Sequence, residues 1–176
     1  MARNIEIKAR VLDRTAIREK ALALARNSPE LVEQTDTFFV VPRGRLKIRE
    51  FADGSGELIS YERHDEPGPK ESTYTRVPCQ SARDLSHALG RVLPLRGRVI
   101  KQREVFLVGR TRLHLDTVEN LGSFVELEVV LQDNEHAQAA EHEARELMEK
   151  LGIQPQDLVP DAYIDILERT DVSHQK

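Results

Sequence analysis

The sequence predicts an α+β fold: a closed, eight-stranded antiparallel β-barrel with helices packed outside it. About eight segments of strand length alternate apolar and polar residues, and several are joined by turns too short to hold a crossover helix. One face of these segments is charged, and this face is acidic on some segments and basic on others. A few segments with helical spacing lie between the strands, and their apolar sides can cover the outside of a barrel.

The expected strands follow from alternation and from β-branched residues. Two pairs of them flank short turn sequences, Asp53-Gly54-Ser55-Gly56 and Gly109-Arg110, and these indicate β-hairpins. The expected strands span residues 4–11, 33–41, 45–50, 57–63, 71–77, 99–108, 111–118 and 123–131.

Four helices are expected between and after these strands. Asp13 is a suitable N-cap for a first helix, and the pair Ser81 and Asp84 for a second. Asp133 or Asn134 is expected to cap a long third helix that ends at Leu151-Gly152. The helices are placed at about 14–26, 82–92, 135–151 and 161–168. We expect one domain over residues 1–170 and a short tail over 171–176.

Composition limits the classes of function. The 176 residues include one cysteine, Cys79, which excludes an internal disulfide and a multi-cysteine zinc site. The chain has no long apolar run and no signal-peptide pattern at its start, so we expect a cytoplasmic protein without a membrane partner. The net charge of −4 and 5% aromatic content disfavour nucleic-acid binding. A homodimer is possible, and the sequence does not decide the oligomeric state.

One face of each expected strand is charged, and the charges differ between strands. Alternate residues of a strand share a face, so a carboxylate-bearing face arises on the first and last strands and basic faces on those between. For a single strand, a solvated face is the more common explanation of such a pattern. The joint sorting of sign instead favours a polar barrel interior. The faces are Asn4, Glu6 and Lys8; Arg45, Lys47 and Arg49; Tyr61 and Arg63; Lys101 and Arg103; Arg110, Arg112, His114 and Asp116; and Glu126 and Glu128.

Buried charges are costly unless they are paired, hydrated or bound to ions, and this interior suits a polyanion with its metal. Glu126 and Glu128 can converge from one strand, Glu6 can join them from the first strand, and Asp116 is a further candidate ligand. Carboxylate oxygens without cysteine favour Mg²⁺ or Mn²⁺. His114 has two interpretations, as a metal ligand or as a phosphate donor within a polar network, and the second is preferred.

An ordered series of motifs resembles the CYTH superfamily, the triphosphate tunnel enzymes. Asn4-x-Glu6-x-Lys8 is similar to the Glu-x-Glu-x-Lys signature of that family, and the stretch from His114 to Glu128 is most similar to the class IV adenylyl cyclase branch. The series continues over 34–39, 44–49, 58–63, 101–103, 112–116 and 121–128.

The resemblance implies an eight-stranded tunnel and particular roles for individual residues. Glu6, Glu126 and Glu128 would be metal ligands, with Asp116 near them, and Lys8, Asp116 and Arg112 would act as catalytic residues. His114 joins the substrate-binding set as a candidate phosphate donor. The residues expected to contact phosphates are Lys8, Lys47, Arg49, Arg63, Lys101, Arg103 and Arg112. Asn4 replaces the first glutamate of the signature, so the site has one negative charge fewer.

The expected function is that of a metal-dependent adenylyl cyclase-like enzyme, which converts ATP to cyclic AMP and pyrophosphate. The alternative is a phosphatase acting on inorganic, thiamine or nucleoside triphosphate, with ATP, tripolyphosphate or thiamine triphosphate as ligand. A third hypothesis is a binding module that captures a phosphorylated ligand without turnover, because the missing carboxylate at Asn4 weakens the metal site.

Overall fold

The computed structural model describes residues 2–66 and 68–174, with side chains as far as residue 170. Eight strands form one closed antiparallel barrel in the order β1-β5-β4-β3-β2-β6-β7-β8. The ring closes because β1 pairs with β5 on one side and with β8 on the other. The strands are β1 (Ala2–Arg10), β2 (Glu30–Phe39), β3 (Arg45–Phe51), β4 (Gly56–Arg63), β5 (Lys70–Cys79), β6 (Leu95–Val108), β7 (Thr111–Val118) and β8 (Gly122–Val130). The predicted barrel is therefore confirmed.

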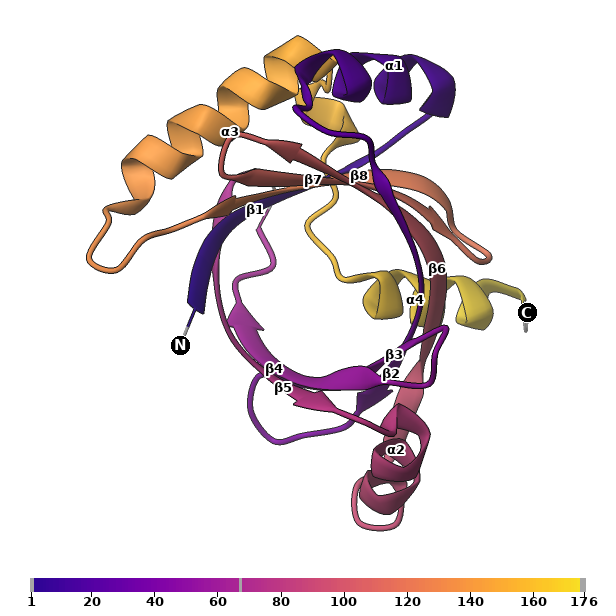
Figure 1. Ribbon diagram of the computed structural model, residues 1–176. Coiled ribbons are helices and arrows are strands. Elements are labelled where there is room, and N and C mark those ends of the chain that lie inside the picture. Colours follow the sequence, from indigo (N-terminus) through magenta and orange to yellow (C-terminus); the bar gives the residue numbers. More distant parts are fainter. Residues whose placement is uncertain (1, 67, 175–176) are drawn as a thin grey trace.

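The helices are α1 (Arg14–Leu24), α2 (Ala82–Gly90), α3 (Ala137–Leu151) and α4 (Tyr163–His174), with a short 3₁₀ turn at Pro155–Asp157. Figure 1 looks along the barrel and shows α1 and α3 on one side of the ring and α2 on the opposite side. Asp13 and Ser81 cap α1 and α2 as predicted. None of the helices in the described residues is long and apolar enough to cross a bilayer.

The cap predicted for α3 is wrong. The N-cap is His136, two or three residues after the predicted Asp133 or Asn134. Asn134 has a φ of 65°, a left-handed conformation suited to a turn, so the chain is still turning there. Helix α4 begins two residues later than predicted and continues to His174, so the expected domain boundary at 170 falls within a helix; residues 175–176 lie outside the described residues.

The largest apolar core lies outside the barrel wall, between the wall and helices α1 and α3. Alternate residues of β1, β7 and β8 face outward there, and Ile7, Leu113 and Leu127 are fully buried against the helices. A smaller core beneath α2 holds Phe39 and Ile48. Because the aliphatic faces are covered from outside, the opposite faces of the same strands must look into the barrel.

The C-terminal segment closes one end of the barrel. The backbone N–H of Val159 donates to the carbonyl of Lys8, and Ala162, Tyr163 and Ile164 then pack on Phe124 and other apolar residues at this rim, namely Phe38, Val99 and Val118. Figure 1 shows helix α4 beside β6. Lys8 and Lys70 donate to the carbonyls of Asp161 and Pro160, and Ala162 and Tyr163 line the cavity, so the segment leading into α4 covers this end.

The close approach of α2 to the β3–β4 hairpin depends on Gly56. A Cβ added there would lie 2.1 Å from the Arg49 carbonyl oxygen and 2.7 Å from Ala82 Cβ. We predict that Gly56→Ala lowers the free energy of unfolding by about 1–3 kcal/mol, because the backbone must shift to admit the methyl group. Urea denaturation measures the effect. In the matched control Gly90→Ala the added Cβ meets nothing within 4 Å, and this variant should be neutral or more stable. Equal stability of both variants would contradict this account.

Candidate functional site

The barrel encloses a cavity of about 280 Å³, and half of the residues that line it are charged. Eight lysines and arginines and five acidic residues line it, a net charge of +3 when all are ionised. The whole chain carries −4, so positive charge is concentrated inside the barrel while the exterior is acidic. The basic residues are Lys8, Lys47, Arg49, Arg63, Arg76, Lys101, Arg103 and Arg112, and the acidic residues are Glu6, Asp36, Glu57, Glu126 and Glu128.

The cavity has two chemically different walls. On the wall made by β2, β3 and β6, Asp36 is 1% exposed and accepts hydrogen bonds from Lys47 at 2.7 Å, Lys101 at 2.8 Å and both Nε and Nη2 of Arg49. Burial alone would raise the pKa of Asp36, but Arg49, Lys101 and Lys47 outweigh burial and hold that pKa well below its usual value. This wall thus presents three cations gathered by one carboxylate.

Burial has the opposite consequence for the lysines on this wall. Loss of water around the ammonium group is the main cause that lowers the pKa of Lys47 to about 7, and the charge of Arg49 adds to it. Burial likewise lowers the pKa of Lys101. This wall has one carboxylate, Asp36, for three basic side chains. An anion that entered the cavity would therefore favour the protonated form of the two lysines.

The opposite wall, made by β1, β7 and β8, carries carboxylates. Glu126 lies 3.2 Å from Lys8 and 2.5 Å from Arg103, and Glu128 lies 2.8 Å from Arg112. Burial raises the pKa of Glu126, but Lys8 and Arg103 hold it well below the usual range. Glu128 behaves alike: burial opposes ionisation, and His114 and Arg112 lower its pKa. Both side chains are therefore ionised near neutral pH.

The structure brings most of the predicted site residues together and separates a few. The cavity lining includes all of the predicted phosphate-contacting residues and three of the four predicted metal ligands. Asp116 is fully buried and does not line the cavity. Its carboxylate accepts hydrogen bonds from Arg103 and from the hydroxyl of Tyr163, which covers it at the end that the C-terminal segment closes. Glu6 lines the cavity but accepts a 2.6 Å hydrogen bond from Arg63.

One group of three potential metal-binding side chains stands out in the described ranges. Ligand atoms of His114, Glu126 and Glu128 all lie within 4.8 Å of one another. Two carboxylates and an imidazole are a suitable donor set for a divalent cation.

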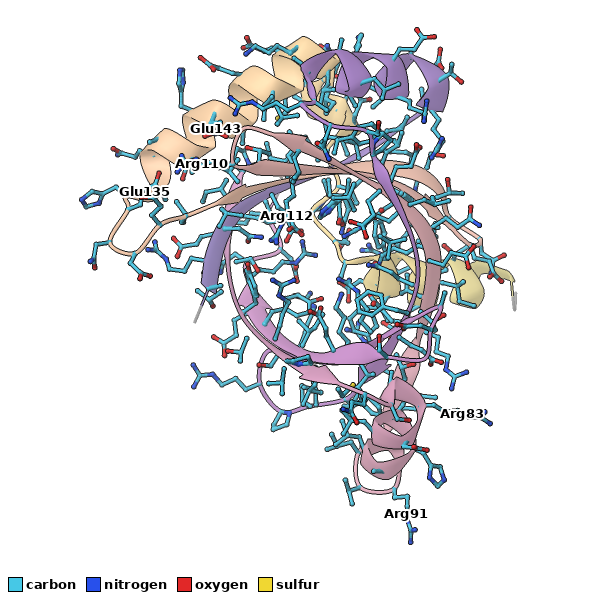
Figure 2. All side chains as sticks on the ribbon, in the orientation of Figure 1. Arg83, Arg91, Arg110, Arg112, Glu135 and Glu143 are labelled. Atoms are coloured by element: carbon cyan, nitrogen blue, oxygen red, sulfur yellow. The ribbon has the colours of Figure 1, made fainter. Side chains whose placement is uncertain are left out.

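Arg110 corrects the prediction for the seventh strand. Alternation placed it on the inner face with Arg112, but it lies in the β6–β7 turn and pairs outside the barrel with Glu135 and Glu143. Figure 2 shows Arg110 beside these two glutamates and Arg112 within the ring. Period-two alternation fails at this position because it ends where the strand ends.

Sequence reasoning missed Asp36 and left Tyr163 undecided. Alternation from Gln34 through Asp36 to Phe38 places Asp36 on the inner face, so the signal was present in the sequence. From the sequence alone, Tyr163 in Pro160-Asp161-Ala162-Tyr163 has two possible roles, closing one mouth of the tunnel or simple packing, and local periodicity does not choose between them. It is buried at the closed end, donates to Asp116, and lies with its ring 4.1 Å from Lys8 Nζ.

Comparison with known proteins places this geometry in a family. The model of the CYTH domain matches residues 2–163. The chain belongs to the CYTH domain family. Members of this family are triphosphate-processing enzymes, and the closed barrel with its charged interior is the architecture expected of them. A search of curated proteins finds no match to this CYTH chain.

Solved structures agree on the CYTH fold. A protein from Pyrococcus horikoshii OT3 superposes with a TM-score of 0.83 at 24% identity and covers 92% of this chain and 98% of its own. A Vibrio parahaemolyticus protein, provisionally described as an adenylate cyclase, gives 0.74 at 18% identity over 94% and 97%. A Hippeastrum protein, described as having a dominant triphosphatase activity, gives 0.65 at 15% identity over 95% and 96%.

The three-cation cluster around Asp36 yields a stability prediction. Asp36→Asn removes the buried charge that Lys47, Arg49 and Lys101 share, and we expect a loss of about 3–5 kcal/mol in the free energy of unfolding. Urea denaturation at pH 7 checks it. Glu19→Gln, at an exposed position of α1, is the control and should change stability by less than about 0.5 kcal/mol. An Asp36→Asn protein as stable as this control would show that the cluster contributes nothing.

Proposed function

We propose that this CYTH protein is a metal-dependent enzyme that converts ATP to cyclic AMP and pyrophosphate. The observation that carries the proposal is the enclosed cavity of net charge +3, with three gathered cations on one wall and a carboxylate–imidazole group on the other. A triphosphate supplies the negative charge that the first wall lacks, and a divalent cation suits the second.

The cationic groups are arranged for phosphate oxygens. Arg63 is buried, and its Nε and Nη2 atoms have no hydrogen-bond partner within the protein. A buried guanidinium nitrogen without a partner costs free energy, which an entering phosphate oxygen would recover. Lys47, Arg49 and Lys101 would bind further phosphate oxygens while Asp36 keeps them in place.

The end of the cavity that the C-terminal segment covers favours chemistry at the α-phosphate. If the terminal phosphate enters first, it comes to rest near Lys8 and Arg63, next to the segment that closes the barrel. The α-phosphate then lies nearer the open end, on the side of Glu128 and Arg112, and the base lies near the rim residues Phe51 and Tyr74. Water has poor access to a terminal phosphorus held at the closed end, whereas the ribose hydroxyl arrives with the substrate.

Cyclisation makes one bond and breaks one bond. The ribose 3′-oxygen attacks the α-phosphorus, and the bond from that phosphorus to the bridging oxygen of the β-phosphate breaks, so pyrophosphate leaves. The proton of the 3′-hydroxyl passes to the departing pyrophosphate or to solvent. Lys8, Lys101 and Arg63 would neutralise the leaving group, and Arg103 and Arg112 would hold the α-phosphate oxygens. A Mg²⁺ or Mn²⁺ ion held by Glu126 and Glu128 would supply positive charge that acidifies the attacking hydroxyl.

Hydrolysis of the terminal phosphate is the second candidate. The Hippeastrum protein of the same fold is described as having a dominant triphosphatase activity. The same lining residues would bind the phosphates, and water would take the place of the ribose hydroxyl. The orientation of the substrate separates the two reactions, because it decides which phosphorus meets the nucleophile.

We predict that the protein with ATP and Mn²⁺ releases cyclic AMP and pyrophosphate in equal amounts. Chromatography of the products, with tripolyphosphate and thiamine triphosphate tested in parallel and Mg²⁺ compared with Mn²⁺, provides the measurement. Arg103→Ala should lower the rate at least 100-fold, because Arg103 links both cavity walls to the substrate phosphates. Release of free phosphate in place of cyclic AMP would refute cyclisation, and tight binding without any product would indicate a binding module.

We further predict that triphosphate binding takes up protons at pH 8. Lys47, whose pKa is about 7 in the empty cavity, is mostly neutral at pH 8 and must gain a proton beside the phosphates. Affinity should therefore fall as pH rises above 7. Calorimetry of tripolyphosphate binding in buffers of different ionisation enthalpy measures the uptake. Lys47→Arg keeps its charge at this pH, so the uptake in this variant should be smaller by nearly one proton. An unchanged uptake would remove Lys47 from the phosphate site.

A further inference from the structure

The wall formed by β7 and β8 brings one imidazole to two carboxylates. Nδ1 of His114 lies 3.8 Å from an oxygen of Glu126 and 3.8 Å from an oxygen of Glu128. The ligand atoms of the three residues lie within 4.8 Å of one another. Two metal–ligand distances of about 2.1 Å together span about 4.2 Å, so small side-chain movements would let one cation touch all three.

The imidazole nitrogen that faces the two carboxylates is buried. His114 is 5% exposed, and its Nδ1 atom makes no hydrogen bond. A buried nitrogen without a hydrogen bond is unfavourable, and a cation bound to it would remove that cost. Arg112 binds Oε2 of Glu128, whereas the imidazole faces Oε1 of the same carboxylate. The arginine and a cation would therefore use different oxygens of Glu128.

The β1 side of the cavity is the weaker place for a cation. Glu6 is engaged by Arg63 at 2.6 Å, and the residue two positions before it is the neutral Asn4. The Oδ1 atom of Asn4 is buried without a hydrogen-bond partner and brings no negative charge. All three carboxylates are paired with cations: Glu6 with Arg63, Glu126 with Lys8 and Arg103, and Glu128 with Arg112. β1 thus offers one carboxylate, whereas β7 and β8 together offer two carboxylates and an imidazole.

We propose that His114, together with Glu126 and Glu128, binds a single divalent cation, and that this imidazole makes the site prefer Mn²⁺ to Mg²⁺. Mg²⁺ demands oxygen ligands, whereas imidazole nitrogen is a common ligand of transition metals. The inference rests on the proposed function and deepens it, since it names the cation and adds a ligand from β7.

The test uses Mn²⁺ alone, without any phosphate compound. Titration of the full chain, followed by the electron paramagnetic resonance signal of free Mn²⁺, should show one site. His114→Gln should weaken Mn²⁺ binding at least tenfold, while Mg²⁺ affinity, measured by competition, should change less than threefold. His114→Asn is the second variant in case the first does not fold, and circular dichroism melting checks both. Glu6→Gln is the matched control on β1 and should keep Mn²⁺ affinity within threefold.

Two results would overturn the inference: folded His114 variants that bind Mn²⁺ like the wild type, or a Glu6→Gln protein that loses Mn²⁺ while His114→Gln retains it. A His114 variant that binds Mn²⁺ normally but loses tripolyphosphate in the absence of metal would reassign the imidazole to phosphate donation, and so also overturn it. Absence of any product from wild-type protein that binds Mn²⁺ as expected would refute the proposed function and leave the metal site standing.

Discussion

The structure depends on charge compensation inside a closed ring of strands. Once β1 pairs with β5 and β8, every strand has one face toward the enclosed space, and polar side chains there lose most of their water. The protein meets this cost by pairing: Asp36 gathers three cations, and Arg103 links Asp116 and Glu126. Removal of one partner leaves the others as uncompensated buried charges, so the residues of the interior are energetically coupled.

The pairing leaves particular groups unsatisfied, and these groups mark where ligands would bind. The interior holds more cations than carboxylates, two buried nitrogens of Arg63 make no hydrogen bond, and the Nδ1 atom of His114 beside two glutamates makes none either. The first two features suit phosphate oxygens, and the third suits a divalent cation. Burial is the main cause that lowers the pKa of Lys47 in the empty cavity, with the charge of Arg49 adding to it, and an entering triphosphate would favour the protonated lysine.

The helices do different work from the barrel wall. α1, α2 and α3 cover the aliphatic outer faces and so fix which face of each strand looks inward. The segment leading into α4 instead crosses one end, where the Tyr163 hydroxyl donates to Asp116 and the Tyr163 ring lies against Lys8 Nζ. With one end of the cavity covered, a substrate would enter from the other end. The orientation in which it enters would separate attack at the α-phosphate from attack at the terminal phosphate.

The sequence by itself determined the barrel and most of its lining, because side-chain direction in a strand has a period of two and needs no knowledge of neighbours. Lys47, Arg49, Lys101, Glu126 and Glu128 follow from alternation alone, and Asp36 would have followed too. Only the tertiary structure decided how these residues pair. Strand order brought Lys8 to Glu126 and Lys101 to Asp36. The β6–β7 turn placed Arg110 outside the barrel, and packing of the C-terminal segment covered Asp116 with Tyr163. Those outcomes depend on contacts between residues distant in the chain, which local periodicity does not encode.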